Sequence, residues 1–158
     1  MTRVYRILRR AYSKKPLDGE GAYRFGGRWS STGTRLAYTS EHLSLAMLEY
    51  LVHVESAEAP NDLVVIPADV PSSVSRVSIA AKQLPKHWRQ FPAPTELTRF
   101  GDEFVRKNRA AVLIAPSALV PGESNWLINP RHPDFQQIRV NPAETLHYDP
   151  RFFPMSDS

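Results

Sequence analysis

The sequence predicts an α+β fold in which mixed or antiparallel sheets are flanked by helices, and three observations favour it. Short runs rich in apolar, aromatic and β-branched residues recur along the chain, as is typical of strands. Two longer segments carry apolar residues at helical spacing. Strands and helices do not alternate as they would around a parallel sheet. With 158 residues, 42% of them hydrophobic, the chain is expected to form one domain over residues 1–158.

The first half of the chain is expected to hold two strands, a loop and a helix. Strands are predicted over residues 3–8 and 35–40, and the Gly-rich segment between them is predicted to be a loop. Ser40 is a suitable N-cap, and apolar residues at helical spacing follow it. A helix is therefore predicted over residues 41–54.

The second half is expected to contain a buried strand, a helix and several short strands. A continuous apolar run predicts the strand over residues 62–70, in which Pro67 marks an edge or a bulge. The helix is predicted over residues 94–108, with a proline in its first turn. Further strands are predicted over residues 110–116, 124–129 and 135–140, and a weaker one over 144–149.

Composition argues against several classes of protein. The chain has no long apolar run, and its N-terminus lacks the order of a secretion signal, so a soluble cytoplasmic protein without membrane association is expected. The absence of cysteine excludes disulfides and thiolate metal sites. The five histidines never reach two-ligand helical spacing, so no metal site is expected.

Positive charge is concentrated near the N-terminus. The first 35 residues hold nine basic and two acidic residues, a net charge of +7, so the remainder carries −3 of the total of +4. This distribution favours an anionic partner such as a phosphate group, a nucleic acid or an acidic protein. A solvated basic edge without a partner would look the same.

Glu49 stands in an otherwise apolar part of the predicted helix over residues 41–54. A buried lone carboxylate is costly, so it must be protonated, be paired with a cation, or line a water-filled cleft. The structural explanation is an ion pair with Arg28 or His53. The functional explanation requires partner residues that converge on the carboxylate.

Three residues are candidate partners of Glu49. Arg28 follows two glycines in GGRW, where the backbone can approach a ligand closely and the guanidinium can bind phosphate or carboxylate by two hydrogen bonds. Tyr38 lies in a predicted strand, and Ser117 follows one. Each has a structural alternative: a surface arginine, a core tyrosine and a turn serine. The glycines do not fit a dinucleotide-binding loop, and Ser117 lacks the glycines of a nucleophile elbow.

Four stretches of the chain, in this order, resemble the RES-domain family: RVYR, GEGAYRFGGRWSSTGTRLAYTSEHLSLAMLEYLVH, APSALVPGESNWLINPRHPDF and HYDPRF. The resemblance covers nearly the whole chain and is weakest over residues 72–95. The family is named for an arginine, a glutamate and a serine, which correspond here to Arg28, Glu49 and Ser117.

The resemblance implies the toxin of a bacterial type II toxin–antitoxin system, with a fold similar to that of the ADP-ribosyltransferases related to diphtheria toxin. It also implies NAD⁺ as a substrate, with no bound cofactor. Members of the family deplete NAD⁺ by hydrolysis or phosphorolysis, or transfer its ADP-ribose to a protein. An Xre-type helix-turn-helix antitoxin that occludes the active site is the implied partner. Direct DNA binding is not expected, and a homodimer is left open.

The resemblance also implies a role for each candidate residue. Cleavage between nicotinamide and ribose passes through an oxocarbenium-like cation, which the carboxylate of Glu49 would stabilise. Arg28, helped by Arg6, would bind the phosphates of NAD⁺. Tyr38 would stack against nicotinamide, and Ser117 would bind substrate or orient Glu49.

Two other functions are compatible with the same residues. A metal-independent ribonuclease toxin would use the N-terminal arginines to bind phosphates. A non-catalytic DNA- or protein-binding module would use GGRW and the basic segment as a contact surface.

Overall fold

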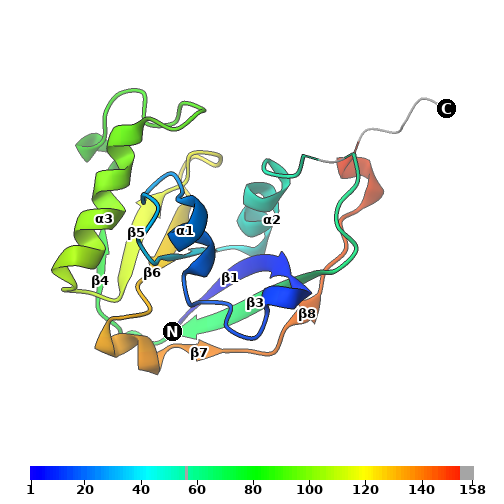
Figure 1. Ribbon diagram of the computed structural model, residues 1–158, viewed down its shortest axis with the longest axis horizontal. Coiled ribbons are helices and arrows are strands. Elements are labelled where there is room, and N and C mark those ends of the chain that lie inside the picture. The colour runs from blue at the N-terminus through cyan, green and yellow to red at the C-terminus, as the bar shows by residue number, and fades with distance from the viewer. Residues whose placement is uncertain (56, 154–158) are drawn as a thin grey trace.

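The computed structural model describes residues 1–55 and 57–153, which form one eight-stranded sheet with three α-helices packed around it (Figure 1). In chain order the elements are β1 (Thr2–Arg9), α1 (Glu20–Phe25), β2 (Ala37–Ser40), α2 (Leu43–Leu51), β3 (Leu63–Val70), β4 (Arg76–Ser78), α3 (Thr98–Lys107), β5 (Val112–Pro116), β6 (Ser124–Ile128), β7 (Arg139–Val140) and β8 (Glu144–Thr145). The strand order is β4-β5-β6-β2-β1-β3-β7, and β8 also pairs with β3. Every pairing is antiparallel except that of β4 with β5. The predicted α+β fold with a mixed sheet is confirmed.

The sheet consists of two halves that meet at a short junction between β1 and β2. Among the described residues, the register between these strands holds one pair, Tyr5 with Ser40. By contrast, β1 pairs with β3 along its full length, and β2 pairs with β6 along four residues. Figure 1 shows α3 beside the half that contains β5 and β6, α2 beside the half that contains β1 and β3, and α1 between them. Residues from the two halves can therefore meet near the junction.

Separate cores fix the two longer helices to their own halves of the sheet. The core under α3 includes Leu97, Phe104, Leu113 and Leu127. The core under α2 includes Ile7, Ala46, Leu63 and Val65. Because side chains alternate across a strand, Tyr5 and Ile7 of β1 both face α2. Apolar packing holds each helix in place on its half of the sheet. A polar residue on the helix face that does not pack against the sheet is therefore held in a fixed position.

Most predicted elements are present with shorter bounds. The helix predicted over residues 41–54 is α2, and its N-cap is His42 rather than Ser40, which belongs to β2. The helix predicted over residues 94–108 is α3, preceded by a 3₁₀ turn at Thr95–Leu97. Pro67 lies inside β3, between the residues that pair with β8 and those that pair with β7. Pro67 has no backbone N–H to donate, and it lies where neither β7 nor β8 is paired with β3. A proline is therefore tolerated at this position of the strand.

Two elements arise where none was predicted. The segment expected to be a loop contains α1, which begins after Gly19 with a φ of 73°. A Cβ at Gly19 would lie 2.8 Å from the backbone nitrogen of Leu36, so a larger residue would not fit. The strand β4 is the second unpredicted element, and its parallel pairing with β5 stabilises a run too short to have a recognisable pattern.

The strands predicted at residues 135–140 and 144–149 are wrong over most of their lengths. Residues Pro133–Gln137 form a 3₁₀ helix, which the Nδ1 of His132 caps by accepting the N–H of Asp134. A proline in the first turn favours this helix over a strand. Only the two-residue strands β7 and β8 pair with β3. No helix among the described residues is both long enough and apolar enough to cross a membrane.

Candidate active site

The structure brings Glu49 and Ser117 together from the two halves of the sheet. Glu49 lies on α2, and Ser117 directly follows β5. The hydroxyl of Ser117 donates a hydrogen bond to Oε1 of Glu49 over 3.3 Å. It also accepts the backbone N–H groups of Leu119 at 3.1 Å and Val120 at 3.0 Å. Because these two donors occupy the lone pairs of the oxygen, the hydroxyl proton is left to point at Glu49.

Glu49 is half-buried and forms no salt bridge within the described chain. Burial raises the pKa of its carboxyl group, while hydrogen bonding to Asn125 and Ser117 and the charges of His53 and Arg28 oppose that rise. The ion pair with Arg28 or His53, proposed as a structural explanation, is therefore not formed. A carboxylate with hydrogen-bond donors but no paired cation is placed to interact with a positively charged ligand.

Arg28 lies in the turn that follows α1, and one of its terminal nitrogens is fixed. Its Nη1 donates to the backbone oxygens of Trp88 at 2.8 Å and Gln90 at 3.1 Å. In the described part of the chain, its Nε and Nη2 have no hydrogen-bond partner. Burial lowers the pKa of Arg28, and the nearby charge of Glu49 opposes this shift. The side chain is thus oriented by the protein and keeps two donor atoms for an anion.

Tyr38 holds the turn that carries Arg28. Its hydroxyl oxygen accepts the backbone N–H of Trp29 at 3.1 Å and lies 2.8 Å from the hydroxyl of Ser30. Burial raises the pKa of Tyr38 to about 12, so the phenol is neutral at physiological pH. A Cβ at Gly27 would lie 2.7 Å from this hydroxyl, which explains the second glycine of GGRW. Tyr38 therefore already positions the turn before any ligand binds.

The N-terminal half of α3 anchors the same turn from its other side. The backbone N–H of Gly101 donates to the carbonyl oxygen of Trp29 over 2.8 Å. The carboxylate of Asp102 accepts the backbone N–H of Ser31 at 3.0 Å, the hydroxyl of Thr34 at 2.8 Å and the hydroxyl of Ser31. This anchor was not predicted from the sequence, although a glycine inside an amphipathic helix is a recognisable departure from helix propensity.

Polar contacts also tie the loop that carries Ser117 to the start of α2. The Nδ1 of His42 lies 3.0 Å from Oε1 of Glu123, and Oε1 of Glu41 accepts the N–H of Ser124 at 2.8 Å. The N–H of Ser117 donates to the carbonyl oxygen of Glu123. These contacts explain how a residue after β5 reaches a helix that belongs to the other half of the sheet.

Asn125 is a member of the cluster that the sequence analysis did not identify. It lies on β6 opposite Ser40 of β2, and its Nδ2 donates to the hydroxyl of Ser40 over 3.1 Å. Its amide is one of the groups that oppose the burial-induced rise in the pKa of Glu49. The only signal in the sequence was an asparagine inside the apolar strand SNWLI.

Arg6 is joined to the cluster indirectly. Since Tyr5 and Ile7 face α2, strand alternation directs Arg6 to the opposite face of β1. Its Nη1 donates to the carbonyl oxygen of Tyr38 over 2.9 Å. Its Nε is buried without a partner among the described residues, and burial lowers the pKa of the side chain. Arg6 thus supports the backbone of β2, and its unpaired Nε is enclosed by the protein.

Exposed apolar side chains lie next to the candidate residues in the chain. Phe25 is 82% exposed and precedes the Arg28 turn, whereas Phe91 is 81% exposed and follows the backbone that Arg28 binds. Leu48 on α2 and Val52, which follows α2, are exposed close to Glu49 in the chain, and Leu119 is exposed after Ser117. We call these five residues the apolar rim. Large exposed apolar side chains are candidates for contact with another molecule.

Comparisons with known proteins identify the family of the chain. The RES domain family matches residues 3–149. A Sphingobium protein named Prs ADP-ribosylating toxin is 36% identical over 144 residues, which are 90% of this chain and 89% of that protein. A Yersinia enterocolitica protein named Toxin Res is 35% identical over 150 residues, or 94% of this chain and 97% of that protein.

A solved structure shares the fold. It is the toxin-antitoxin complex of MbcT and MbcA from M. tuberculosis, which matches with a TM-score of 0.74 over 92% of this chain and 84% of that chain. The sequence identity is 17%, so this match concerns the fold.

Proposed function

The chain belongs to the RES domain family, and from this premise we propose that it is the toxin of a toxin–antitoxin pair and cleaves the bond between nicotinamide and ribose in NAD⁺. The observation that carries the proposal is the carboxylate of Glu49, which is half-buried, oriented by Ser117 and not neutralised by a salt bridge. Such a group suits the stabilisation of a short-lived cation.

In the proposed reaction, the glycosidic C–N bond breaks and its electron pair neutralises the charged nicotinamide ring. The ribose is left with oxocarbenium character, which Glu49 stabilises electrostatically and through a hydrogen bond to a ribose hydroxyl. The Nε and Nη2 of Arg28 bind the phosphates of NAD⁺. Arg6 helps by holding the carbonyl oxygen of Tyr38 in place. Tyr38 holds the turn of Arg28 and offers its ring to nicotinamide, and Ser117 orients Glu49.

The acceptor of ADP-ribose defines two variants of this function. Transfer to water or phosphate would deplete NAD⁺, and this is the variant we propose first. Transfer to a protein is the second, because a relative that is 36% identical is named Prs ADP-ribosylating toxin. Both variants require the same bond cleavage and the same residues.

We also propose that an antitoxin covers this site. The structural neighbour was solved as a toxin-antitoxin complex, and the apolar rim provides exposed surface for a protein partner next to Glu49. A helix-turn-helix antitoxin of Xre type, encoded beside this chain, is the partner we propose.

The function is tested by incubating the purified chain with NAD⁺, with and without phosphate, and identifying the products by mass spectrometry. Free nicotinamide should form, and Glu49→Gln should lower turnover by about 100- to 1000-fold, because a charge aimed at the transition state is lost. Binding of NAD⁺ should change little, since the amide oxygen still accepts a hydrogen bond.

The matched control is Glu103→Gln, which removes a carboxylate from an exposed position on α3 and should leave turnover unchanged. If the folded Glu49→Gln protein consumed NAD⁺ at the normal rate, Glu49 would not be the catalytic group. Cleavage of RNA, with NAD⁺ left intact, would instead support the ribonuclease alternative.

A further inference from the structure

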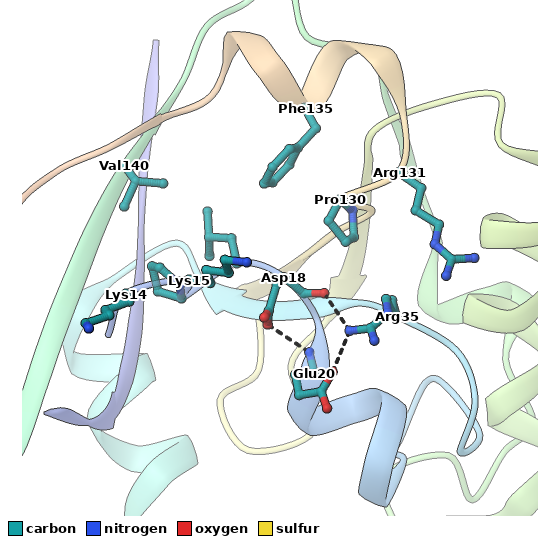
Figure 2. Close-up of a pocket in the computed structure, with 11 residues that line it drawn as sticks. Lys14, Lys15, Asp18, Glu20, Arg35, Pro130, Arg131, Phe135 and Val140 are labelled. Atoms are coloured by element: carbon teal, nitrogen blue, oxygen red, sulfur yellow. Dashed lines mark hydrogen bonds and ion pairs between the residues drawn. The ribbon is translucent and has the colours of Figure 1, made fainter. Parts of the chain in front are cut away.

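A concave site lies at the other end of α1 from Arg28. It is a surface pocket of about 680 Å³ between the loop that precedes α1 and the 3₁₀ helix Pro133–Gln137 (Figure 2). Glu20, the first residue of α1, lines this pocket, while the last residue of α1 leads into the Arg28 turn. None of the candidate active-site residues lines it.

The floor of the pocket is apolar. Leu17 is buried beneath it, Phe135 is partly buried, and Val140 is 42% exposed. Figure 2 shows the ring of Phe135 directed into the pocket. A pocket that leaves a valine and part of a phenyl ring accessible gains from covering them with another apolar side chain.

The rim of the pocket is positively charged. Lys14, Lys15 and Arg131 are exposed, and their side chains have no ion-pair partner among the described residues. In Figure 2 the two lysines lie on one side of the pocket and Arg131 on the other. A ligand that spans the pocket would therefore meet cations at both ends.

The acidic groups of the pocket are already engaged. Glu20 binds Arg35 at 2.7 Å and Arg24 at 2.7 Å, and these two hydrogen bonds lower its pKa. Asp18 accepts the backbone N–H of Glu20 at 3.0 Å. They do not pair with the lysines or with Arg131, so the cations of the rim remain available to a ligand.

We propose that this pocket binds an acidic segment of a partner protein, with one apolar side chain of that segment against Phe135 and carboxylates at Lys14, Lys15 and Arg131. The positive charge of the rim favours a negatively charged ligand. The apolar floor between the cations favours a peptide in which carboxylates alternate with a bulky apolar residue. The site is separate from Glu49, so the proposal stands whether or not the chain cleaves NAD⁺.

A peptide matches this surface better than a nucleotide or a free phosphate. A phosphate site gathers backbone N–H groups and cations around one point, often at a glycine-rich turn. Here the three cations lie on the rim, on both sides of an apolar floor, and no glycine lines the pocket. Cations on opposite sides of an apolar floor favour several carboxylates over one multiply charged group.

The test measures binding of a fluorescein-labelled peptide, Glu-Glu-Leu-Glu-Phe-Glu-Glu, to the full chain by fluorescence anisotropy at about 150 mM salt, where weak surface attraction is screened. The double variant Lys14→Glu and Lys15→Glu should weaken binding by at least about tenfold, because it places like charges opposite the peptide. Arg131→Glu should weaken it in the same direction.

The matched control reverses two exposed lysines outside the pocket, Lys86→Glu and Lys107→Glu, with the same change in net charge. If the control weakened binding as much as the pocket variant, the attraction would be nonspecific and the proposal would be wrong. Displacement of the peptide by inorganic phosphate, ADP or a short RNA would also overturn it. Amide chemical shifts of the unmodified chain provide a second measurement, and peptide-induced changes should centre on Leu17 and Phe135.

Discussion

At position 49, burial and hydrogen bonding act on one carboxylate in opposite directions. Burial raises the pKa of Glu49, and the donors around it limit the rise. If the ionised form is the active one, protonation removes activity as the pH falls through this raised pKa. The acid limb of kcat/KM should therefore lie above pH 4.5, the ordinary value for glutamate.

Initial rates of NAD⁺ consumption between about pH 4 and 8 would measure this limb. Ionisation of Glu49 is unfavourable in the folded state, so its contribution to stability should improve as the pH falls. Glu49→Gln should then melt at the same or a higher temperature than the unmodified chain at neutral pH. A large loss of melting temperature would show that the carboxylate has a structural role.

Arg28 should act mainly in substrate binding, because a phosphate contact persists from the ground state to the transition state. Arg28→Ala should weaken NAD⁺ affinity by about 1.5 to 3 kcal/mol, the range of a charge-assisted hydrogen bond, and raise KM more than it lowers kcat. Isothermal titration calorimetry would measure the change. Arg106→Ala, at an exposed position on α3, is the control. Unchanged affinity in Arg28→Ala would remove Arg28 from the site.

At the scale of elements, α3 and the Arg28 turn form one packed unit. A Cβ at Gly101 would lie 2.1 Å from the carbonyl oxygen of Trp29, so Gly101→Ala must push the turn away from the helix. We expect a loss of about 1 to 3 kcal/mol in the free energy of unfolding, as for other overpacked sites, together with a higher KM for NAD⁺.

Urea denaturation and steady-state kinetics would measure these two effects of Gly101→Ala. The control is Gly21→Ala in α1, where the new Cβ would lie no closer than 3.7 Å to a neighbouring atom. That change should leave stability the same or raise it, because alanine has the higher helix propensity. Equal stability of the two variants would show that the turn tolerates displacement.

At the scale of the whole molecule, a buried carboxylate ties β1, β3 and β7 together. Asp69 is 4% exposed at its side chain and accepts hydrogen bonds from Arg3 at 2.8 and 3.0 Å and from Asn141 at 3.0 Å. These donors, with Arg139 at 3.6 Å, hold the pKa of Asp69 well below its usual value of 3.8. Its stabilising effect is therefore present above the unfolded-state pKa and is lost as the pH falls toward the folded-state value.

Asp69→Asn should lower the melting temperature at neutral pH, and the difference from the unmodified chain should shrink as the solution is acidified below about pH 4. Differential scanning calorimetry at several pH values would measure this. Asp149→Asn removes an exposed carboxylate that pairs with the nearby Arg151, so it should change the melting temperature little. A difference for Asp69→Asn that stays constant with pH would contradict the assigned role of its charge.

The sequence by itself determined the features that depend on local pattern. Helical spacing located α2 and α3, apolar runs located β1, β3, β5 and β6, and the motif residues identified the family. It also identified Glu49, Arg28, Tyr38 and Ser117 as residues worth testing together. It did not recognise β4 and predicted β7 and β8 as much longer strands, because strands of two or three residues have too few positions to show alternation.

Tertiary structure alone decided how the candidate residues meet. The contact of Ser117 with Glu49 joins residues that are 68 positions apart, and the contact of Arg28 with Gln90 joins residues 62 apart. The contact of Asn125 with Ser40, the contact of Gly101 with Trp29 and the pocket at Phe135 also join segments that are far apart in the chain. Local pattern records which face of an element is buried. Which elements face one another depends on strand pairing and core packing across the whole chain.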